Sequence, residues 1–340
     1  MAKTTHGLPE TKGFFRLRGI TTGLNKEDAL KTQTFDSGSV KNTAKIGIKT
    51  DKDSTVYVNI EGFKSKDATL FKYSDKKGEK PVQKKVSWDE RYKYVEQGYS
   101  VIGVRLGLAK DNDGKNITNT YAQFDAAQEV KSKLSDNTSV YLQGQIDYSS
   151  FKNRDGDSIR SKKLLADALF LNSKEIDFDS DEFEALSDFK QRLIYIGIDK
   201  HEDGAKFVLE AKIVTRNSIE NAEFIIYDKS LATTIRKNLK PYQAIDVTGR
   251  ILSILDTEEV EETGIWGKQS SFDKVNKSFI REYVIEGANP NTIDTETYSE
   301  EIIDEAIQKL NSEGQQKSTT SDNWGNDKKV EVDEDDLPWW

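Results

Sequence analysis

Hydrophobic and polar residues alternate along much of the first half of the chain, a pattern that predicts β-strands. Residues 44–49 place two isoleucines on one face and Lys45 and Lys49 on the other. Residues 55–63 repeat the arrangement, with valine and isoleucine on the inner face. The aromatic residues expected on the outer face are Tyr57 and Phe63.

The spacing of apolar residues then changes to that of an amphipathic helix. Residues 124–134 carry alanine, valine and leucine along one stripe. A strand at residues 140–146 follows, then a hairpin turn at 151–157 and a strand that continues to residue 170. The predicted order is three strands, a helix and two strands.

The second half of the chain repeats this order. Strands are predicted at residues 207–214 and 222–227, and a helix at 230–239. Residues 245–251 then match residues 140–146 at an offset of 105, position for position in apolar and polar character. Each copy carries a glycine at the same place, where a strand of a small barrel must bend sharply. We therefore predict an internal duplication.

An arrangement of three strands, a helix and two strands is that of the OB-fold, a five-stranded Greek-key barrel. We therefore predict an all-β-dominated protein with minor α content, made of two tandem OB-fold barrels. The predicted parts are a first domain at 1–174 with an insertion at about 64–122, an acidic linker at 175–189, a second domain at 190–312 that ends in a helix, and a disordered acidic tail at 313–340.

Charge is divided unequally between the two halves. Residues 1–174 hold 31 of the 50 Lys and Arg residues and 22 of the 59 Asp and Glu residues, a balance of +9. Because the whole chain has a formal charge of −9, residues 175–340 carry −18. A basic first half is the electrostatic pattern expected of a polyanion-binding domain, whereas the second half is expected to pack or to contact proteins, with nucleic-acid binding as its alternative.

Several classes of site have little support in the composition. The chain has no cysteine and two histidines, which argues against thiolate zinc sites, cysteine nucleophiles and histidine-based triads. The segments 111–114 and 154–157 resemble ion-binding loops but read better as turns. We expect no enzyme activity, no cofactor and no metal. No membrane-length apolar run or secretory signal is visible, so a cytoplasmic protein without membrane association is expected.

The chain ends with four consecutive acidic residues followed by an apolar, aromatic tip. This composition favours a tethered peptide that a partner protein captures, although a charged end without a partner is the simpler alternative. The residues expected to bind a partner are Asp333, Glu334, Asp335, Asp336, Leu337, Pro338, Trp339 and Trp340.

Residues 124–170 and this tail together resemble bacterial and phage single-stranded DNA-binding proteins. The shared motifs are a helix that leads into Val140-Tyr141-Leu142-Gln143-Gly144, a basic and aromatic hairpin, and an acidic end with Leu337-Pro338 and an aromatic residue. The resemblance implies single-stranded DNA as ligand and replication, recombination or repair proteins as partners of the tail. Two barrels and a terminal Trp340 in place of the family's Phe are departures, which leave the oligomeric state and the tail's partners open.

Capture of a single strand requires cations along the phosphates and flat rings on which bases stack. The first half supplies both, interleaved, although any one ring could instead seal a small core. The candidate residues are Arg16, Arg18, Lys45, Lys49, Tyr57, Phe63, Phe71, Lys72, Tyr73, Lys84, Lys85, Trp88, Arg91, Tyr92, Tyr94, Tyr148, Phe151, Arg154 and Arg160.

The sequence thus favours a protein that coats single-stranded DNA without sequence preference and recruits partners through its tail. A tandem OB-fold adaptor that binds only proteins is the alternative. RNA in place of DNA, the strand polarity and the size of the binding site stay open at this point. The two-barrel arrangement and the polar composition are typical of a phage or plasmid protein.

Overall fold

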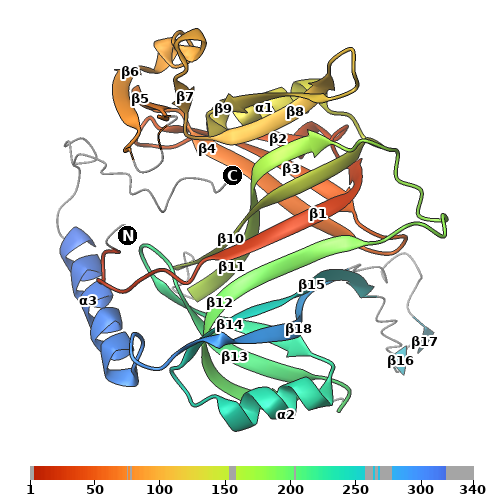
Figure 1. Cartoon of the computed structure of the whole chain (residues 1–340). Helices are drawn as coiled ribbons and strands as arrows, with labels where there is room; N and C mark the ends of the chain where they lie inside the picture. Colours follow the sequence, from red (N-terminus) through yellow and green to blue (C-terminus); the bar gives the residue numbers. More distant parts are fainter. Residues whose placement is uncertain are drawn as a thin grey trace.

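The computed structural model describes residues 4–74, 76, 79–152, 158–202, 204–256, 263–264, 267–268 and 278–318. Most of the regular structure in these ranges is β, as predicted, and a mixed sheet of 13 strands runs through both halves of the chain (Figure 1). Neighbouring strands in this sheet follow the order β13-β14-β18-β15-β12-β1-β10-β11-β4-β3-β2.

Five strands of the first half pair in a closed ring. β1 pairs with β10 and β3, β3 with β4, β4 with β11 in parallel, and β11 with β10. Alternating residues of these strands point inward, so that valines, isoleucines and leucines fill the ring. The helix α1 follows β4 and its insertion, and its buried alanines pack on the ring. The bounds are β1 Gly13–Thr22, β3 Val40–Lys49, β4 Thr55–Phe63, α1 Gln123–Lys133, β10 Ser139–Lys152 and β11 Ser158–Leu171.

A second ring in the other half has the same connectivity. β12 pairs with β13 and β15, β13 with β14, β14 with β18 in parallel, and β18 with β15. The helix α2 again precedes the fourth strand, and its N-terminus is capped by the Asp228 side chain. The bounds are β12 Leu186–Lys200, β13 Phe207–Val214, β14 Ile219–Ile226, α2 Lys229–Asn238, β15 Ala244–Asp256 and β18 Ser278–Asp294.

The repeat at an offset of 105 is visible in the backbone pairing. Gly144 pairs with Phe15 on one side, and Gly249 pairs with Phe189. Each glycine also lies at a register shift against the last strand of its ring. A Cβ atom would lie 1.9 Å from the Leu165 carbonyl oxygen at Gly144, and as close to an equivalent oxygen at Gly249. Only glycine fits this approach of two backbones, which explains the residue in both copies.

The segment between β4 and α1 forms a small subdomain beside the first ring (Figure 1). A three-stranded sheet pairs in the order β6-β5-β7, and β8 and β9 form a hairpin whose first strand pairs with β11 in parallel. A separate cluster of buried apolar residues holds this subdomain together. The bounds are β5 Asp67–Lys72, β6 Val82–Ser87, η2 Trp88–Glu90, η3 Val95–Gln97, β7 Ser100–Val101, β8 Val104–Lys110 and β9 Asn116–Tyr121.

Shorter elements complete the described chain. The 3-10 helix η1 precedes β2, which pairs with the first part of β3, and β16 and β17 form a two-stranded antiparallel sheet. The helix α3 follows β18, and its Ile303 and Ala306 are buried against the second ring, as the helical spacing predicts. The bounds are η1 Glu27–Ala29, β2 Leu30–Thr34, β16 Thr263–Gly264, β17 Gly267–Lys268 and α3 Glu300–Ser318.

The two rings are not separated by a free linker. β12 begins at Leu186 and pairs with β1, and Phe189 is buried in the core. The predicted linker of residues 175–189 therefore extends four residues too far, because residues 186–189 belong to β12, the strand that joins both rings. This pairing makes the sheet continuous from one unit to the other.

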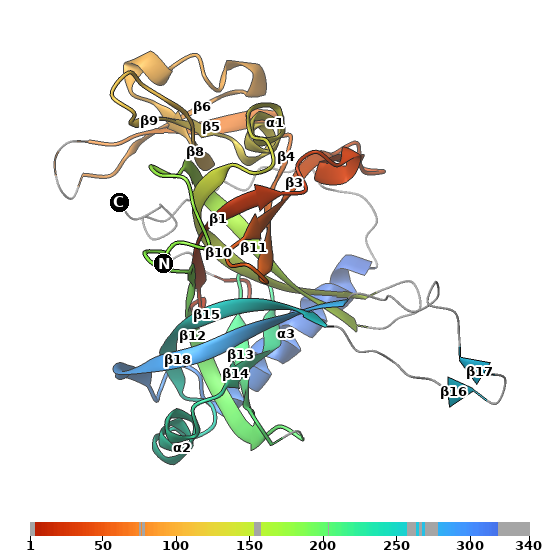
Figure 2. The same ribbon diagram turned by 90° about the vertical axis from the view of Figure 1, so that its right-hand side faces the viewer.

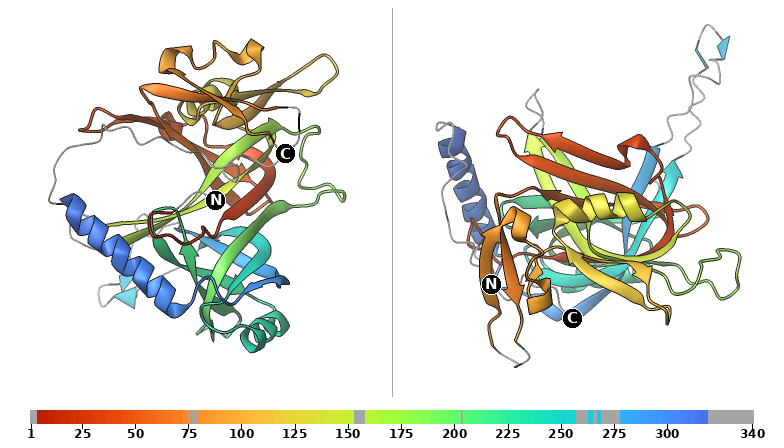
Figure 3. Two further views of the ribbon diagram at one scale, coloured as in Figure 1. Left: turned by 60° about the vertical axis from the view of Figure 1, so that its left-hand side comes forward. Right: turned by 90° about the horizontal axis from the view of Figure 1, so that it is seen from above.

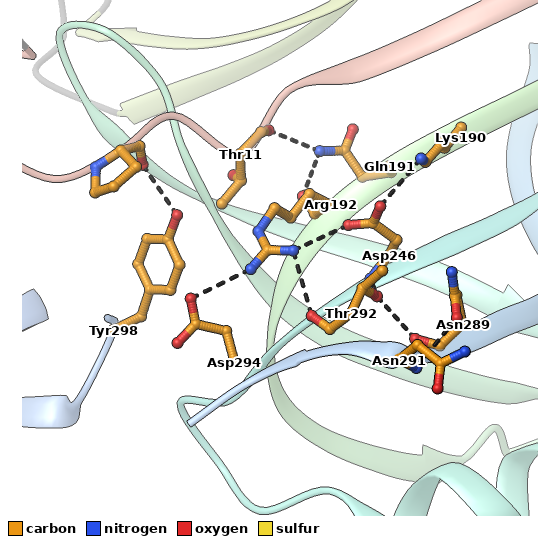
Figure 4. Close-up of polar contacts among 11 residues, drawn as sticks. Thr11, Lys190, Gln191, Arg192, Asp246, Asn289, Asn291, Thr292, Asp294 and Tyr298 are labelled. Atoms are coloured by element: carbon orange, nitrogen blue, oxygen red, sulfur yellow. Dashed lines mark hydrogen bonds and ion pairs between the residues drawn. The ribbon is translucent and has the colours of Figure 1, made fainter. Parts of the chain in front are cut away.

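The N-terminal segment, which precedes β1, packs against the second ring (Figures 3 and 4). Its residue Thr11 accepts a hydrogen bond from the Gln191 amide at 2.9 Å, and its backbone N–H donates to Val214. Next to this contact, Arg192 lies between Asp246 and Asp294, at 3.1 Å and 3.3 Å. Because the N-terminal segment also packs against α3, it links the start and the end of the described chain.

Two long hairpins, β10–β11 and β15–β18, project to the same side of the molecule (Figure 2). Each one contacts the other unit. Arg281 on β18 donates to the Tyr57 carbonyl at 3.3 Å, and Lys162 on β11 donates to the Glu223 carbonyl at 3.5 Å. The Ser150 hydroxyl of the first unit donates to the Glu220 carboxylate at 3.0 Å. Each ring with its helix and hairpin is called a unit below. The hairpin of each unit contacts the other unit, and a cleft lies between the two.

Candidate nucleic-acid interface

The outer face of β3 and β4 carries rings beside cations, as the alternation predicts. The Lys45 Nζ atom lies 4.7 Å from the centre of the Tyr57 ring, and the Lys41 Nζ atom lies 5.5 Å from that of Phe63. Phe63 is 51% exposed, and a second ring, Phe35, lies beside it at 5.7 Å. Flat, accessible rings flanked by ammonium groups are the combination that stacked bases and their phosphates require.

Strand geometry produces this surface. Tyr57 and Phe63 alternate with Val56, Val58 and Ile60, which are all at most 1% exposed. Burial of the aliphatic set in the ring forces the aromatic set outward. The face is not purely cationic, because Glu61 lies within 2.8 Å of Lys41 and within 3.6 Å of Lys163. Lys45 has no such carboxylate partner among the described residues.

A second group of rings and cations lies on the insertion. The Lys84 Nζ atom is 3.4 Å from the centre of the Tyr94 ring and 5.7 Å from that of Tyr99. The Lys72 Nζ atom lies 5.8 Å from the centre of the Tyr99 ring, and Tyr73 is 55% exposed. Lys72 and Tyr73 are exposed, whereas Lys84, Tyr94 and Tyr99 are half-buried, and all five belong to a subdomain beside the ring.

Three of the rings expected on the surface are in the interior. Phe71 is 2% exposed, Tyr148 5% and Trp88 9%. Phe71 is buried on β5 next to Leu70, Trp88 belongs to the buried cluster of the insertion, and Tyr148 lies on the inner face of β10. The prediction that these rings stack on bases is therefore wrong, because a small subdomain and a long hairpin need large apolar side chains of their own.

Arg91 and Tyr92 have a structural contact in place of an exposed one. The Arg91 guanidinium forms a bidentate pair with Asp125 at 2.7 Å and 2.9 Å, and the Tyr92 hydroxyl donates to the same carboxylate at 2.6 Å. Burial and the carboxylate raise the pKa of Tyr92 well above its ordinary value. The three residues fasten the insertion to α1, so we remove Arg91 and Tyr92 from the candidate interface.

Other predicted cations have contacts away from the outer face of β3 and β4. Arg16 pairs with Asp188 at 3.0 Å, and Lys85 pairs with Asp67 at 3.1 Å. Arg18 donates to the Glu184 carbonyl, and the Lys49 Nζ atom lies 5.5 Å from the Phe178 ring. The basic surplus of the first half is therefore spread over several surfaces, and only part of it lies beside the outer face of β3 and β4.

Some predicted residues lie outside the described part. Arg154 and the tail residues from Asp333 to Trp340 are among them, and the Phe151 side chain is as well. Arg160 is described and exposed, and it lines the cleft between the units.

Three cations of that cleft, Lys162, Lys206 and Arg281, are not among the residues that the sequence pattern indicates. Lys162 and Arg281 line a volume of about 400 Å³ together with Tyr57, Ser253 and Tyr283. Burial, and secondarily the positive charge of Arg281, lower the pKa of Lys162 to about 8. The offset of 105 does not relate Lys162 to Arg281. The second hairpin is longer than the first, so equivalent residues that follow the two hairpin turns are separated by more than 105 positions.

Metal and membrane sites were also sought. Within the residues that the structure describes, no group of three or more His, Asp or Glu side chains is arranged to hold a metal ion. None of the described helices is long and apolar enough to span a membrane.

Comparison with known families gives a match over residues 20–324 to the model of the family YorF. The chain belongs to the YorF family. No curated protein matches it. Solved structures similar to this YorF chain include the single-stranded DNA-binding protein from Thermus aquaticus, as wild type and as a deletion mutant. Both are 11% identical, with TM-scores of 0.37 and 0.38; 83% and 82% of this chain and 93% and 94% of those chains are covered.

Proposed function

We propose that the protein binds single-stranded DNA without sequence preference through the outer face of β3 and β4. The observation that carries the proposal is the Lys45–Tyr57 pair, in which an ammonium without a carboxylate partner among the described residues lies over an outward ring. Phe63 at the end of β4, with Phe35 beside it, extends the aromatic surface. Stacking of bases on such rings contributes about 1–3 kcal/mol for each base and tolerates any sequence.

The proposal includes an OB-fold for each unit. Each ring closes through a parallel pairing of its third and fifth strands, and each has a helix between the third and fourth strands. The OB-fold has this order, and its open face binds extended oligonucleotides. The motif of residues 140–144, with its helix before and its hairpin after, supports the same reading.

The acidic tail is proposed to recruit proteins of DNA replication, recombination or repair. Four consecutive carboxylates suit a basic rim on a partner, and the Leu-Pro-Trp-Trp end suits an apolar pocket. The proposal gives the protein no catalytic step.

A titration with fluorescently labelled single-stranded oligonucleotides at two salt concentrations tests the function. We expect binding at low salt that weakens steeply as salt rises, because phosphate contacts release counterions. Mixed-sequence, polypyrimidine and duplex probes are compared. Absence of binding to the single strands at low salt would overturn the proposal.

An adaptor that binds only proteins is the second candidate. Exposed apolar side chains on the insertion favour it, with Tyr73 and Val95 each 55% exposed and Val82 58%. The same titration separates the two, since an adaptor would leave the oligonucleotide free at every salt concentration.

A further inference from the structure

The cleft between the two units is lined by cations from both. Arg160 and Lys162 come from the first unit, and Lys206 and Arg281 from the second. Two adjoining parts of the cleft, of about 400 Å³ and 450 Å³, share Lys162, Arg281 and Tyr283. Volumes of this size are typical of sites that hold small ligands.

Lys162 and Arg281 occupy equivalent positions of the internal repeat. Lys162 pairs with Tyr148 across the first hairpin, and Arg281 pairs with Ser253 across the second. Tyr148 and Ser253 are separated by the repeat offset of 105. The two cations therefore face one cleft from opposite units, in an arrangement that approximates twofold symmetry.

Their contacts follow the same symmetry. Lys162 donates to the carbonyl of Glu223 on β14, and Arg281 donates to the carbonyl of Tyr57 on β4. Glu223 and Tyr57 are equivalent as well. In each ring, the residue two positions further along the strand pairs in parallel with the last strand of that ring. Neutral carbonyls orient the two cations but leave their charges in place.

The cleft also contains two acidic side chains, Glu223 and Glu282, so its cations differ in how far they are neutralised. No ion pair joins Lys162 or Arg281 to an Asp or Glu among the described residues. Lys206 is paired within the cleft, because the Glu282 carboxylate lies 2.7 Å from its Nζ atom and also accepts a hydrogen bond from the Tyr227 hydroxyl at 2.7 Å. Two like charges in a partly desolvated cleft repel each other, and an anion between them would remove that repulsion.

Aromatic rings hold Lys162 in its place. Its Nζ atom lies 4.1 Å from the centre of the Tyr283 ring, 5.2 Å from that of Phe224 and 5.4 Å from that of Tyr148. Cation–π contacts of this kind stabilise an ammonium that lacks water. The site is therefore built in advance of any ligand, with its charge fixed in position.

We propose that the cleft binds a backbone phosphate of a single strand between Lys162 and Arg281, so that the strand passes from the outer face of β4 onto the second unit. The inference rests on the proposed function. Tyr57 belongs to both places, because it stacks against Lys45 and also lines the cleft. The second unit, acidic as a whole, would thus contribute through Arg281.

The test compares oligonucleotide binding of the full-length protein with that of the double variant Lys162→Gln, Arg281→Gln. Glutamine keeps a hydrogen-bond donor and removes the charge. We expect affinity for a labelled single strand to fall about tenfold or more at low salt. We also expect the slope of log affinity against log salt to become shallower by about 0.7 for each phosphate that the variant no longer neutralises.

Two controls separate the effect from a change in overall charge or in fold. The double variant Lys237→Gln, Lys309→Gln removes two exposed lysines from α2 and α3 and should bind as the wild type does. The variant Lys162→Arg, Arg281→Lys keeps both charges and should retain most of the affinity. Circular dichroism and thermal unfolding show whether each variant is folded. If the Gln variant does not fold, protection of Lys162 from an amine-reactive reagent by the oligonucleotide is measured on the wild type, and absence of protection would contradict the inference.

The outcomes distinguish the two proposals. If the wild type binds the strand and the Gln variant binds equally tightly with the same salt slope, the cleft is not part of the strand's path, while the function stands. If the wild type binds no strand, the function itself fails. Titrations with inorganic phosphate and with a deoxynucleoside triphosphate complete the test. Tight binding of either one that depends on Lys162, without binding of the strand, would make the cleft a site for a free phosphate compound and would overturn the inference.

Discussion

Lys162 on β11 and Arg281 on β18 donate hydrogen bonds to equivalent backbone carbonyls, each on the opposite unit. These two hydrogen bonds join units that differ greatly in net charge, and they place one cation of each unit in the same cleft. The duplication has therefore preserved a contact between the copies as well as the fold of each copy.

Binding of a single strand should depend on pH through Lys162. Its pKa is lowered to about 8, so the side chain is mostly charged at pH 7 and mostly neutral at pH 9. We expect affinity to be full at about pH 7 and to fall about tenfold by about pH 9, because the neutral amine no longer attracts a phosphate. Fluorescence anisotropy at constant ionic strength from pH 6.5 to 9.5 measures this.

Few other groups facing Lys162 interfere with this measurement. The charged groups that act on Lys162 are Arg281 and Glu223, and burial raises the pKa of Tyr283 to about 12 and that of Tyr148 well above its ordinary value. The variant Lys162→Arg, which cannot deprotonate, should show a flat profile. An equally steep profile in this variant would assign the pH dependence to another group.

Tyr57 should contribute a stacking platform. Replacing Tyr57 by Ala removes the ring beside Lys45, and we expect a loss of about 1–3 kcal/mol in binding free energy for a single strand. Tyr57→Phe keeps the ring and should bind as the wild type does. Unchanged affinity in Tyr57→Ala, measured by anisotropy, would exclude the outer face of β4 from the interface.

Asp125 should anchor the insertion. The variant Asp125→Ala leaves the Arg91 guanidinium and the Tyr92 hydroxyl without their half-buried partner, and we expect a loss of about 2–4 kcal/mol in unfolding free energy or early proteolysis within residues 64–122. Urea unfolding and limited trypsin digestion measure the two effects. The exposed pair of Lys93 with Glu90 provides the control, since Glu90→Ala should change little.

Gly144 should be essential to the closure of the first ring. A Cβ atom there would lie 1.9 Å from the Leu165 carbonyl oxygen, so Gly144→Ala must separate two paired strands. We expect a destabilisation of about 2–4 kcal/mol, and the same for Gly249→Ala. Gly197→Ala is the matched control, because that glycine lies in a strand with no atom within 4 Å of the added Cβ. Thermal unfolding that ranks the three variants alike would contradict this account.

Deletion of residues 333–340 should separate recruitment from binding. We expect DNA affinity to be equal or higher without the acidic tip, because its carboxylates compete with phosphates for the same cations. Pull-down with replication or recombination proteins should lose its signal. Lower DNA affinity in the deletion variant would contradict the proposed role of the tail.

The sequence by itself determined the local structure and the duplication. Alternation around Val56 and Val58 identified a strand with a buried face, and the spacing of Leu231 and Ile235 identified a helix, because these patterns depend on the period of each element alone. The match between Gly144 and Gly249 identified the repeat, because a backbone approach that excludes a side chain leaves the same residue in both copies.

The tertiary structure decided which rings are accessible and which charges are unpaired. Trp88 and Tyr148 have the composition of a stacking surface but lie in cores that only folding creates, and Arg91 meets its partner Asp125 from a separate element. Lys162 and Arg281 lie 119 positions apart and come together because two hairpins exchange contacts across the units. Long-range packing sets burial and charge pairing, and a local pattern in the chain contains no information about either.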